Sequence, residues 1–384
     1  MKKLLVEGWR GISHSYAMVN QYELIEFKKQ NIDLHFKDLP FYKESWADEK
    51  NHCGFSQQSL EELYSIQEPS LGERLDVTYR VGFPYFLYPS KSETLFVYGT
   101  SEYQRITEGM VFQGPKKLAF RDLPLKIITP SHWSKLGFLK AGFRDEQITV
   151  ISHGVDQAIF KPLDSQTREQ YRALLGAQNG DFIILSIGAM TSNKGIDVLL
   201  LAYFNLYHHY PNIKLVLKDQ RGVHGQTAQD LVRSICAEKM IDMTSPVVAE
   251  AISRIVFIGQ NLTLVQLNGL YGAADVYVSP YRAEGFNLPP LEAAASGTPI
   301  IVTKGGATDD YVDKSFASLI EATIKNDGDT TYLEPSLESL IDKITLYIES
   351  NNNELDLQNA LKIISEKLTW GVVTKQLINE FDLG

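Results

Sequence analysis

The segment that decides the fold is SPYRAEGFNLPPLEAAASGTP, which occupies positions 279–299. It reads as the end of a strand, a loop, a short helix and the start of another strand. Pro289 suits the first helical turn, where its missing N–H would have no intrahelical partner, and Gly297 tolerates the backbone conformation that ends a helix. Asn287 is a good N-cap residue. The segment therefore predicts a short helix with a defined start and end, placed between two strands.

Apolar runs of strand length surround this helix, at 182–187, 213–217, 255–258, 276–279 and 299–302. They are almost wholly apolar, as parallel strands covered on both faces must be. In the first half of the chain, β-rich runs alternate with helical stretches, at 3–6, 32–36, 77–81, 94–98, 126–129 and 149–152. The fold class is therefore α/β, with two Rossmann-like, doubly wound parallel-sheet domains that face a cleft.

The periodicity is interrupted between 157 and 181, where Lys161-Pro162, several polar residues and Asn179-Gly180-Asp181 lie. We therefore predict an N-terminal domain over 1–160, a linker over 161–180 and a C-terminal domain over 181–368. Ligands of such sheets bind beyond the carboxyl ends of the strands, so functional residues are expected in the loops that follow them.

Composition excludes several classes of protein. The chain has 384 residues, 44% of them hydrophobic, and a formal net charge of −10, which argues against a general nucleic-acid binder. The sequence contains no run of about eighteen apolar residues, which is the length that a membrane-spanning helix needs. The two cysteines, Cys53 and Cys236, show no metal-ligand spacing and fit a reducing compartment. We expect a soluble, cytoplasmic protein.

Two carboxylates mark the quoted segment. Glu284 lies in the loop just before the helix, and Glu292 follows it with seven residues between them. The amides of residues 285–288 would point away from the helix start, where its dipole favours an anionic or hydroxyl-rich ligand. Two glutamates near a helix start are also common without any ligand, so the pattern alone leaves both interpretations open.

The wider sequence resembles glycosyltransferase family 4, retaining enzymes of the GT-B fold whose signature is this Glu-x7-Glu pattern within EGFNLPPLEA (284–293). The likeness extends through VFIG (256–259), LYGAADV (270–276) and GTPII (297–301). The resemblance implies that Glu292 binds the ribose of a nucleotide-sugar donor. It also implies roles at the transferred sugar and diphosphate for Glu284, Gly285, Phe286, Asn287 and Leu288, and a nucleobase near Gly259 and Gln260.

A second donor loop is predicted after the strand at 182–187. Lys194 matches a family lysine that neutralises the diphosphate, and we predict Lys194 and Glu284 as the catalytic residues. Ala189 stands where the family usually has an arginine. Lys218 and Arg282 are the candidates to replace that positive charge, although each could equally be a solvated surface residue.

In the first domain, GWRGISHS (8–15) forms a glycine-containing turn. By resemblance, Gly11 and Ser13 are assigned to the donor, whereas His14 is as readily a capping or packing residue. The family's histidine after the fourth strand is absent, and Thr100 or Glu102 could face the acceptor instead. HGVD (153–156) resembles the family's hinge segment. Residues 369–384 resemble the family's last helix, which crosses back to the first domain.

No metal or other cofactor is expected, because the sequence holds no convincing Asp-x-Asp site and the family needs none. Trp133, Leu136, Phe138, Leu139 and Phe143 interleave with basic residues, which suggests either peripheral contact with an anionic membrane or, in the interpretation we favour, a helix packed on its own sheet.

The resulting function is a metal-independent, retaining hexosyltransferase that uses a UDP-sugar, with UDP-glucose as first choice, and a polysaccharide or lipid-linked saccharide acceptor. The alternatives are a GDP-sugar donor, a nucleotide-sugar epimerase and a non-catalytic nucleotide-sugar sensor. The Glu-x7-Glu context speaks against the epimerase, whereas the missing arginine and histidine keep the sensor open.

Overall fold

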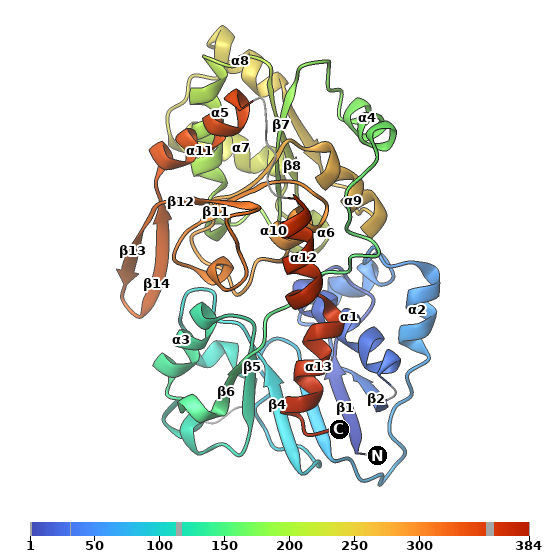
Figure 1. The fold of residues 1–384 in the computed structure, drawn as a ribbon. Coiled ribbons are helices and arrows are strands. Elements are labelled where there is room, and N and C mark those ends of the chain that lie inside the picture. Colours follow the sequence, from blue (N-terminus) through green and yellow to red (C-terminus); the bar gives the residue numbers. More distant parts are fainter. Residues whose placement is uncertain (1, 31, 113–116, 351–356, 384) are drawn as a thin grey trace. The chain divides into compact units, whose positions relative to one another are not determined.

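The computed structural model describes residues 2–30, 32–112, 117–350 and 357–383, and the chain forms two compact units (Figure 1). The first unit consists of Met1–Gly154, Asp327–Thr331 and Glu366–Gly384. The second consists of Val155–Asn326 and Tyr332–Ser365. Each unit is built around one six-stranded sheet.

The sheet of the first unit has the order β2-β1-β3-β4-β5-β6, and its neighbouring strands pair in parallel. Its strands are β1 (Lys3–Gly8), β2 (Asp33–Asp38), β3 (Val77–Val81), β4 (Thr94–Tyr98), β5 (Lys126–Thr129) and β6 (Ile148–Val150). Its helices are α1 (Ser15–Lys29), α2 (Gln57–Tyr64), α3 (His132–Ala141) and α13 (Trp370–Glu380).

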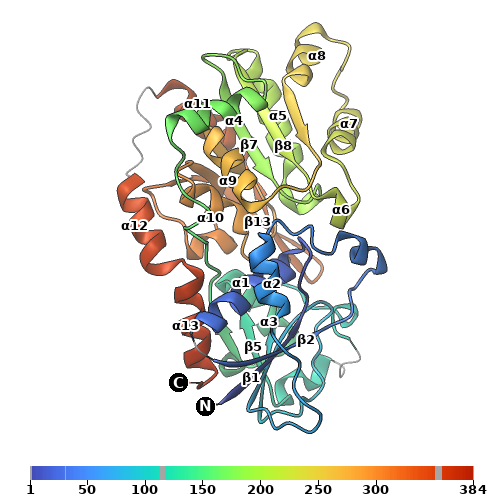
Figure 2. The same ribbon diagram turned by 90° about the vertical axis from the view of Figure 1, so that its right-hand side faces the viewer.

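Helix α13 joins the first unit although it comes last in the sequence. It lies alongside α1 (Figure 2), where Trp370 stacks on Tyr22 with ring centroids 5.0 Å apart. Phe381 follows the helix and packs against Phe27 and Phe96. The core of the first unit is therefore made from both ends of the described chain.

The sheet of the second unit has the order β12-β11-β10-β7-β8-β9 and is also parallel. Its strands are β7 (Phe182–Ile187), β8 (Ile213–Lys218), β9 (Ile255–Ile258), β10 (Val276–Ser279), β11 (Ile300–Thr303) and β12 (Ala317–Ile320). A two-stranded sheet of β13 (Ala322–Asp327) and β14 (Thr330–Pro335) follows. The remaining helices are α4 (Ser165–Leu174), α5 (Ile196–Tyr207), α6 (Arg221–His224), α7 (Ala228–Glu238), α8 (Pro246–Ser253), α9 (Leu264–Ala273), α10 (Leu288–Ala295), α11 (Leu337–Glu349) and α12 (Leu357–Lys367).

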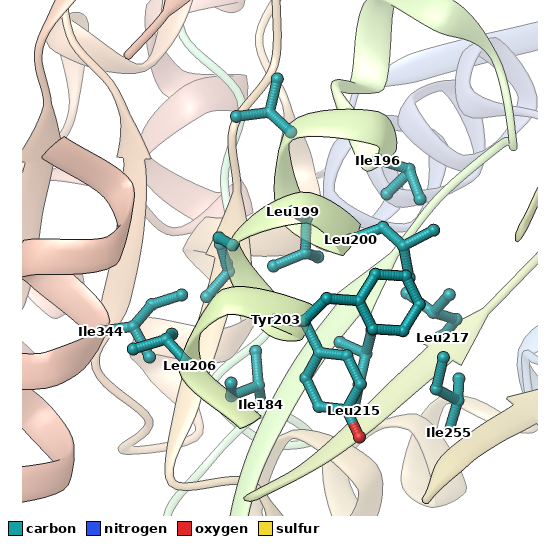
Figure 3. Close-up of a cluster of buried hydrophobic side chains, with 14 of the residues drawn as sticks. Ile184, Ile196, Leu199, Leu200, Tyr203, Leu206, Leu215, Leu217, Ile255 and Ile344 are labelled. Atoms are coloured by element: carbon teal, nitrogen blue, oxygen red, sulfur yellow. The ribbon is translucent and has the colours of Figure 1, made fainter. Parts of the chain in front are cut away.

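Helix α5 fills the core on one face of this second sheet. Leu199, Leu200 and Tyr203 are fully buried against Leu215 of β8 (Figure 3). Each such side chain contributes about 1.5–3 kcal/mol through burial. The Tyr203 hydroxyl donates to the carbonyl oxygen of Ala251 at 2.9 Å, so its polar atom is satisfied inside the core. This packing fixes the strand ends from which the site loops emerge.

The predicted strands agree closely with the structure, and those at 77–81, 94–98, 126–129, 182–187, 255–258 and 276–279 coincide with it residue for residue. The sequence did not reveal β12, β13 and β14. Strand β13 is mostly exposed and polar, with Ile324 as an exposed apolar side chain. It therefore lacks the apolar run that identified the other strands.

The prediction of a linker over 161–180 is wrong, because helix α4 forms there and belongs to the second unit. Asp164 caps the helix by accepting a hydrogen bond from the Thr167 amide. Arg168 and Arg172 then anchor it, since both donate to the carboxylate of Asp275. The polar residues that suggested a linker are the cap and the anchors of a helix.

Candidate active site

Two loops of the second unit meet at the carboxyl ends of the adjacent strands β7 and β10. The carbonyl oxygen of Asn193 accepts a hydrogen bond from the Arg282 amide at 2.7 Å, and the Asn193 side chain donates to the carbonyl oxygen of Ala283. Gly195 is required here: it has φ +66°, and an added Cβ would lie 1.9 Å from the carbonyl oxygen of Pro280. The loops are therefore held together by their backbones before any ligand binds.

The two predicted catalytic side chains meet where these loops touch. Lys194 Nζ donates to Glu284 Oε1. Glu284 is only 4% exposed, so the lysine compensates a carboxylate that has lost most of its water. The sequence predicted each residue separately, and the structure brings them into direct contact.

Asn287 shapes the backbone just before α10, where φ is +72°. Its side chain does not cap the helix, contrary to the prediction; it donates from Nδ2 to Ser279 Oγ at 2.9 Å. The Tyr311 hydroxyl donates to the Asn287 carbonyl oxygen at 2.7 Å, and the Tyr311 ring packs on Phe286. These contacts fix the loop from Gly285 to Leu288, which leads into the N-terminus of α10.

Glu292 lies on α10 and is 9% exposed. The Tyr271 hydroxyl donates to Glu292 Oε2 at 2.7 Å. Burial raises the pKa of Glu292 to about 7, and the hydrogen bond from Tyr271 offsets only part of that effect. Near neutral pH, the Glu292 side chain can therefore be either a protonated acid or a carboxylate that accepts hydrogen bonds from hydroxyl groups.

Arg282, predicted as a candidate to replace the missing family arginine, is paired with two carboxylates in this structure. Its guanidinium forms two hydrogen bonds with Asp197, at 2.7 and 2.8 Å, and two with Glu334, at 3.0 and 2.9 Å. The hydrogen bonds that Arg282 donates to Asp197 are the main reason that the pKa of Arg282 lies above its ordinary value. Arg282 ties three segments of the second unit together.

Lys218 remains a candidate for that charge. It ends β8, next to β7, and only 6% of the residue is exposed. Its Nζ donates to the carbonyl oxygen of Asp219, and burial lowers its pKa. A cation that is this poorly solvated gains more than a surface lysine from an arriving phosphate. Ala189, at the expected arginine position, is buried and uncharged.

The remaining predicted donor residues fall into two groups. Gly259 and Gln260 directly follow β9, at the carboxyl end of the same sheet. Gly11 and Ser13 belong to the first unit. The Gly11 amide donates to Gln21 Oε1 at 2.7 Å, and an added Cβ would lie 2.4 Å from the Tyr64 hydroxyl. Contrary to the prediction, Gly11 does not offer this amide to a donor phosphate in the observed conformation, whereas Ser13 is half-buried in the same turn.

Two histidines of the first unit, His14 and His153, have hydrogen-bond partners within the fold. His14 is the N-cap of α1 and accepts a hydrogen bond from the Tyr16 amide. His153 is buried and pairs with the Tyr98 hydroxyl at 2.9 Å, and burial lowers its pKa to about 3. Thr100, one of the two candidates to replace the absent histidine, is linked to Tyr16 through their hydroxyl groups at 3.0 Å. Glu102, the other candidate, is exposed.

The side chains considered for membrane contact mostly point inward. Trp133, Phe138 and Phe143 are buried, and Leu136 is exposed. Two of the interleaved basic side chains form ion pairs: Lys135 pairs with Asp145, and Arg144 pairs with Glu146. This arrangement agrees with the favoured interpretation, a helix packed on its own sheet. Across residues 2–30, 32–112, 117–350 and 357–383, no helix is long and apolar enough to cross a bilayer.

Two site residues escaped sequence reasoning. Tyr271 was part of the family-like segment at 270–276, but nothing in the sequence indicated that its hydroxyl would reach Glu292, 21 positions later. Tyr311 lies outside every motif.

Comparison with known proteins places this geometry in a family. The family described as "Glycosyl transferases group 1" matches residues 167–362, which is more than half of the 384 residues and contains both site loops, α10 and Tyr271. A "D-inositol 3-phosphate glycosyltransferase" of Corynebacterium aurimucosum is 24% identical over 241 residues, 61% of this chain and 51% of that protein. The "Lipopolysaccharide core biosynthesis mannosyltransferase LpsB" of Rhizobium meliloti is 28% identical over 173 residues, 45% of each protein.

The chain thus spans about half the length of these curated relatives. Over the whole chain, the fold is similar to that of Anabaena Alr3699/HepE crystallised with UDP-glucose, with a TM-score of 0.69, 16% identity and 99% of both chains covered. This likeness establishes the two-sheet GT-B fold. The chain belongs to the group 1 family of glycosyl transferases.

Proposed function

We propose that the protein is a retaining glycosyltransferase that moves a hexose from a UDP-sugar, with UDP-glucose as the first candidate, to a saccharide acceptor. The observation that carries the proposal is the contact between Lys194 and Glu284, made just before the N-terminus of α10, whereas Glu292 lies about one turn inside that helix. At one edge of the sheet, Lys194 supplies a cation, and Glu284 and Glu292 supply carboxylates that can accept hydrogen bonds from hydroxyl groups.

The donor's charge is matched by this edge. A nucleotide sugar brings a diphosphate whose negative charge grows as the bond to the anomeric carbon breaks. Lys194 carries three N–H donors, so it can bind phosphate oxygens while it keeps Glu284 as a partner. The amides at the start of α10 add the positive end of a helix dipole. Lys218, already buried at the neighbouring strand end, is the proposed replacement for the family's arginine.

The two carboxylates recognise hydroxyl groups. Glu284, held by Lys194, accepts hydrogen bonds from the sugar that is transferred. Glu292, held by Tyr271, accepts them from the ribose. Both are almost completely buried, so each hydroxyl that they bind replaces water with a strong, charge-assisted hydrogen bond. The transfer needs no metal in this proposal, because Lys194, Lys218 and the α10 amides neutralise the leaving diphosphate.

The comparisons support the donor more strongly than the acceptor. A fold neighbour was crystallised with UDP-glucose, whereas the two curated relatives are named for different acceptors, an inositol phosphate and a lipopolysaccharide core. We therefore propose a polysaccharide or lipid-linked saccharide acceptor only as a class. A GDP-sugar donor is the alternative. Because Ala189 stands where the family usually has an arginine, a nucleotide-sugar sensor without turnover is a second candidate function.

The test uses UDP-glucose and a GDP-sugar without added metal. Isothermal titration calorimetry measures the binding of each donor, and release of the nucleoside diphosphate measures its slow hydrolysis. We expect micromolar binding of one donor with slow hydrolysis, and loss of both in Lys194→Ala and Glu292→Ala. Binding without any turnover, also with a panel of saccharide acceptors, would favour the sensor. Lack of binding to every nucleotide sugar would refute the proposed function.

A further inference from the structure

Arg221 stands apart from the other arginines of the second unit. Each of the others pairs with a carboxylate within the described residues: Arg168 and Arg172 with Asp275, Arg233 with Asp230, Arg254 with Asp181, and Arg282 with Asp197 and Glu334. The Arg221 guanidinium has no hydrogen bond, ion pair or ring contact to any described residue.

The surroundings hold Arg221 in a defined place. Its backbone amide donates to Asp219 Oδ1, and Asp219 Oδ2 accepts from the Ala228 amide, so the carboxylate nearest in sequence is used to shape the turn. The Asp219 amide in turn donates to the carbonyl oxygen of Ile258. Arg221 is thereby fixed where β8 and β9 end side by side.

The guanidinium lies over Gly259. A Cβ added at this glycine would lie 3.3 Å from Nε and 3.4 Å from Cζ of Arg221. These contacts are tighter than ordinary van der Waals contacts, so a larger residue at position 259 would displace the guanidinium. The absence of a side chain at position 259 therefore lets the guanidinium lie close to the backbone that follows β9, and Arg221 is exposed there.

The sheet order indicates which part of a nucleotide could reach this position. Lys194 follows β7, whereas Arg221 lies between the ends of β8 and β9, one to two strand spacings away, or about 5–10 Å. A diphosphate held by Lys194 and the start of α10 would place its phosphates at one end of this row. The transferred sugar lies on one side of the diphosphate and the nucleoside on the other. Because the sugar is assigned to Glu284, the nucleobase is the part of the ligand left to lie near Gly259.

We propose that Arg221 stacks its guanidinium on the nucleobase of the donor, with Gly259 as the backing surface, and so determines which nucleotide is bound. The assignment rests on the proposed function, because it requires a nucleotide donor. Planar guanidinium groups stack well on aromatic rings, whereas an ammonium group offers a point charge without a face. The residue would act on binding of the base and not on the transfer step.

The test compares UDP, which carries the base, with inorganic pyrophosphate, which does not. Dissociation constants are measured by isothermal titration calorimetry for UDP and by competition against UDP for pyrophosphate. Arg221→Ala is expected to weaken UDP binding about tenfold and to leave pyrophosphate binding unchanged. Arg221→Lys, which keeps the charge but loses the plane, should resemble Arg221→Ala. Arg233→Ala, an exposed arginine on α7, is the matched control and should bind both ligands as the wild type does.

The outcomes separate this inference from the proposed function. If the wild type binds UDP and Arg221→Ala binds it equally well, the stacking role is refuted and the proposed function stands. If Arg221→Ala loses UDP and pyrophosphate in the same proportion, or if Arg221→Lys restores UDP binding, the side chain acts as a charge for the phosphates and the inference is also wrong. If the wild type binds no nucleotide, both proposals fall together.

Discussion

The Tyr311 hydroxyl donates a hydrogen bond to the carbonyl oxygen of Asn287, the residue whose left-handed backbone turns the site loop into α10. The bond is buried and 2.7 Å long, and it joins a segment after β11 to the loop after β10. Because the Asn287 side chain is occupied by Ser279, this phenol is the group that fixes the orientation of the 287–288 peptide. A residue that would not touch the donor thus controls the start of the helix that would bind it.

Removing only this hydroxyl, in Tyr311→Phe, should weaken UDP binding by about three- to tenfold, because the peptide before α10 loses its fixed orientation. The fold should lose about 1 kcal/mol. Tyr203→Phe is the matched control, since it removes another buried tyrosine hydroxyl that donates to a backbone carbonyl, away from the site. If both variants lose equal stability and bind UDP like the wild type, Tyr311 has only a structural role.

Donor binding should depend on pH through Glu292, whose pKa is raised to about 7 by burial. The ionised form accepts the ribose hydroxyl groups, so affinity should be constant well above pH 7 and fall by up to tenfold per pH unit below it. UDP-glucose is the suitable ligand, because both of its phosphates are esterified. Calorimetry in buffers of different ionisation enthalpy should detect proton release on binding near pH 7.

Glu292→Gln provides the control for that titration. Its UDP-glucose affinity should be lower than that of the wild type at pH 8 and should not change between pH 6 and 8. A variant that keeps the wild-type pH dependence would show that another group titrates.

Lys218 and Arg282 should differ in what their removal affects. Lys218→Ala is expected to raise the dissociation constant for UDP about tenfold, because a buried cation beside the site loops is lost. Arg282→Ala should instead lower the free energy of unfolding by about 2 kcal/mol, since it leaves Asp197 and Glu334 without their partner. Thermal unfolding and UDP titration of both variants check this; a reversed pattern would return Arg282 to the site.

Stability at alkaline pH should be limited by Glu23 in the first unit. Burial raises the pKa of this carboxyl group to about 8, although it lies beside the Tyr79 hydroxyl. A raised pKa means that the folded state binds the proton more tightly than the unfolded state. The stabilisation is therefore complete below the ordinary value of 4.5 and is lost as the pH rises through about 8.

Glu23→Gln, which keeps the shape without the titration, should unfold at nearly the same temperature at pH 7 and pH 9, whereas the wild type should be less stable at pH 9. Glu26→Gln, three positions further along α1, is the control and should retain the wild-type loss. A Glu23→Gln variant that loses as much stability as the wild type would exclude this group as the cause.

The sequence predicted the sheets well and the side-chain contacts poorly. Parallel strands such as β7 and β10 are recognised because burial on both faces makes them continuously apolar. The partners of Arg282 could not be foreseen, because Asp197 and Glu334 lie 85 and 52 positions away and only the fold brings them together. The predicted linker failed for a related reason: the polar residues of α4 have partners on Asp275, about a hundred positions later.

The position of α13 has a consequence for synthesis. Residues 1–154 leave the ribosome before residues 370–381, so the aromatic surface of Tyr22, Phe27 and Phe96 remains uncovered until Trp370 and Phe381 have been made. Most of the first unit is therefore translated before the second unit, but the first unit is completed after it. Until then, its exposed aromatic side chains are available to chaperones and to other nascent chains, and a chain truncated before position 370 has a first unit without its covering helix.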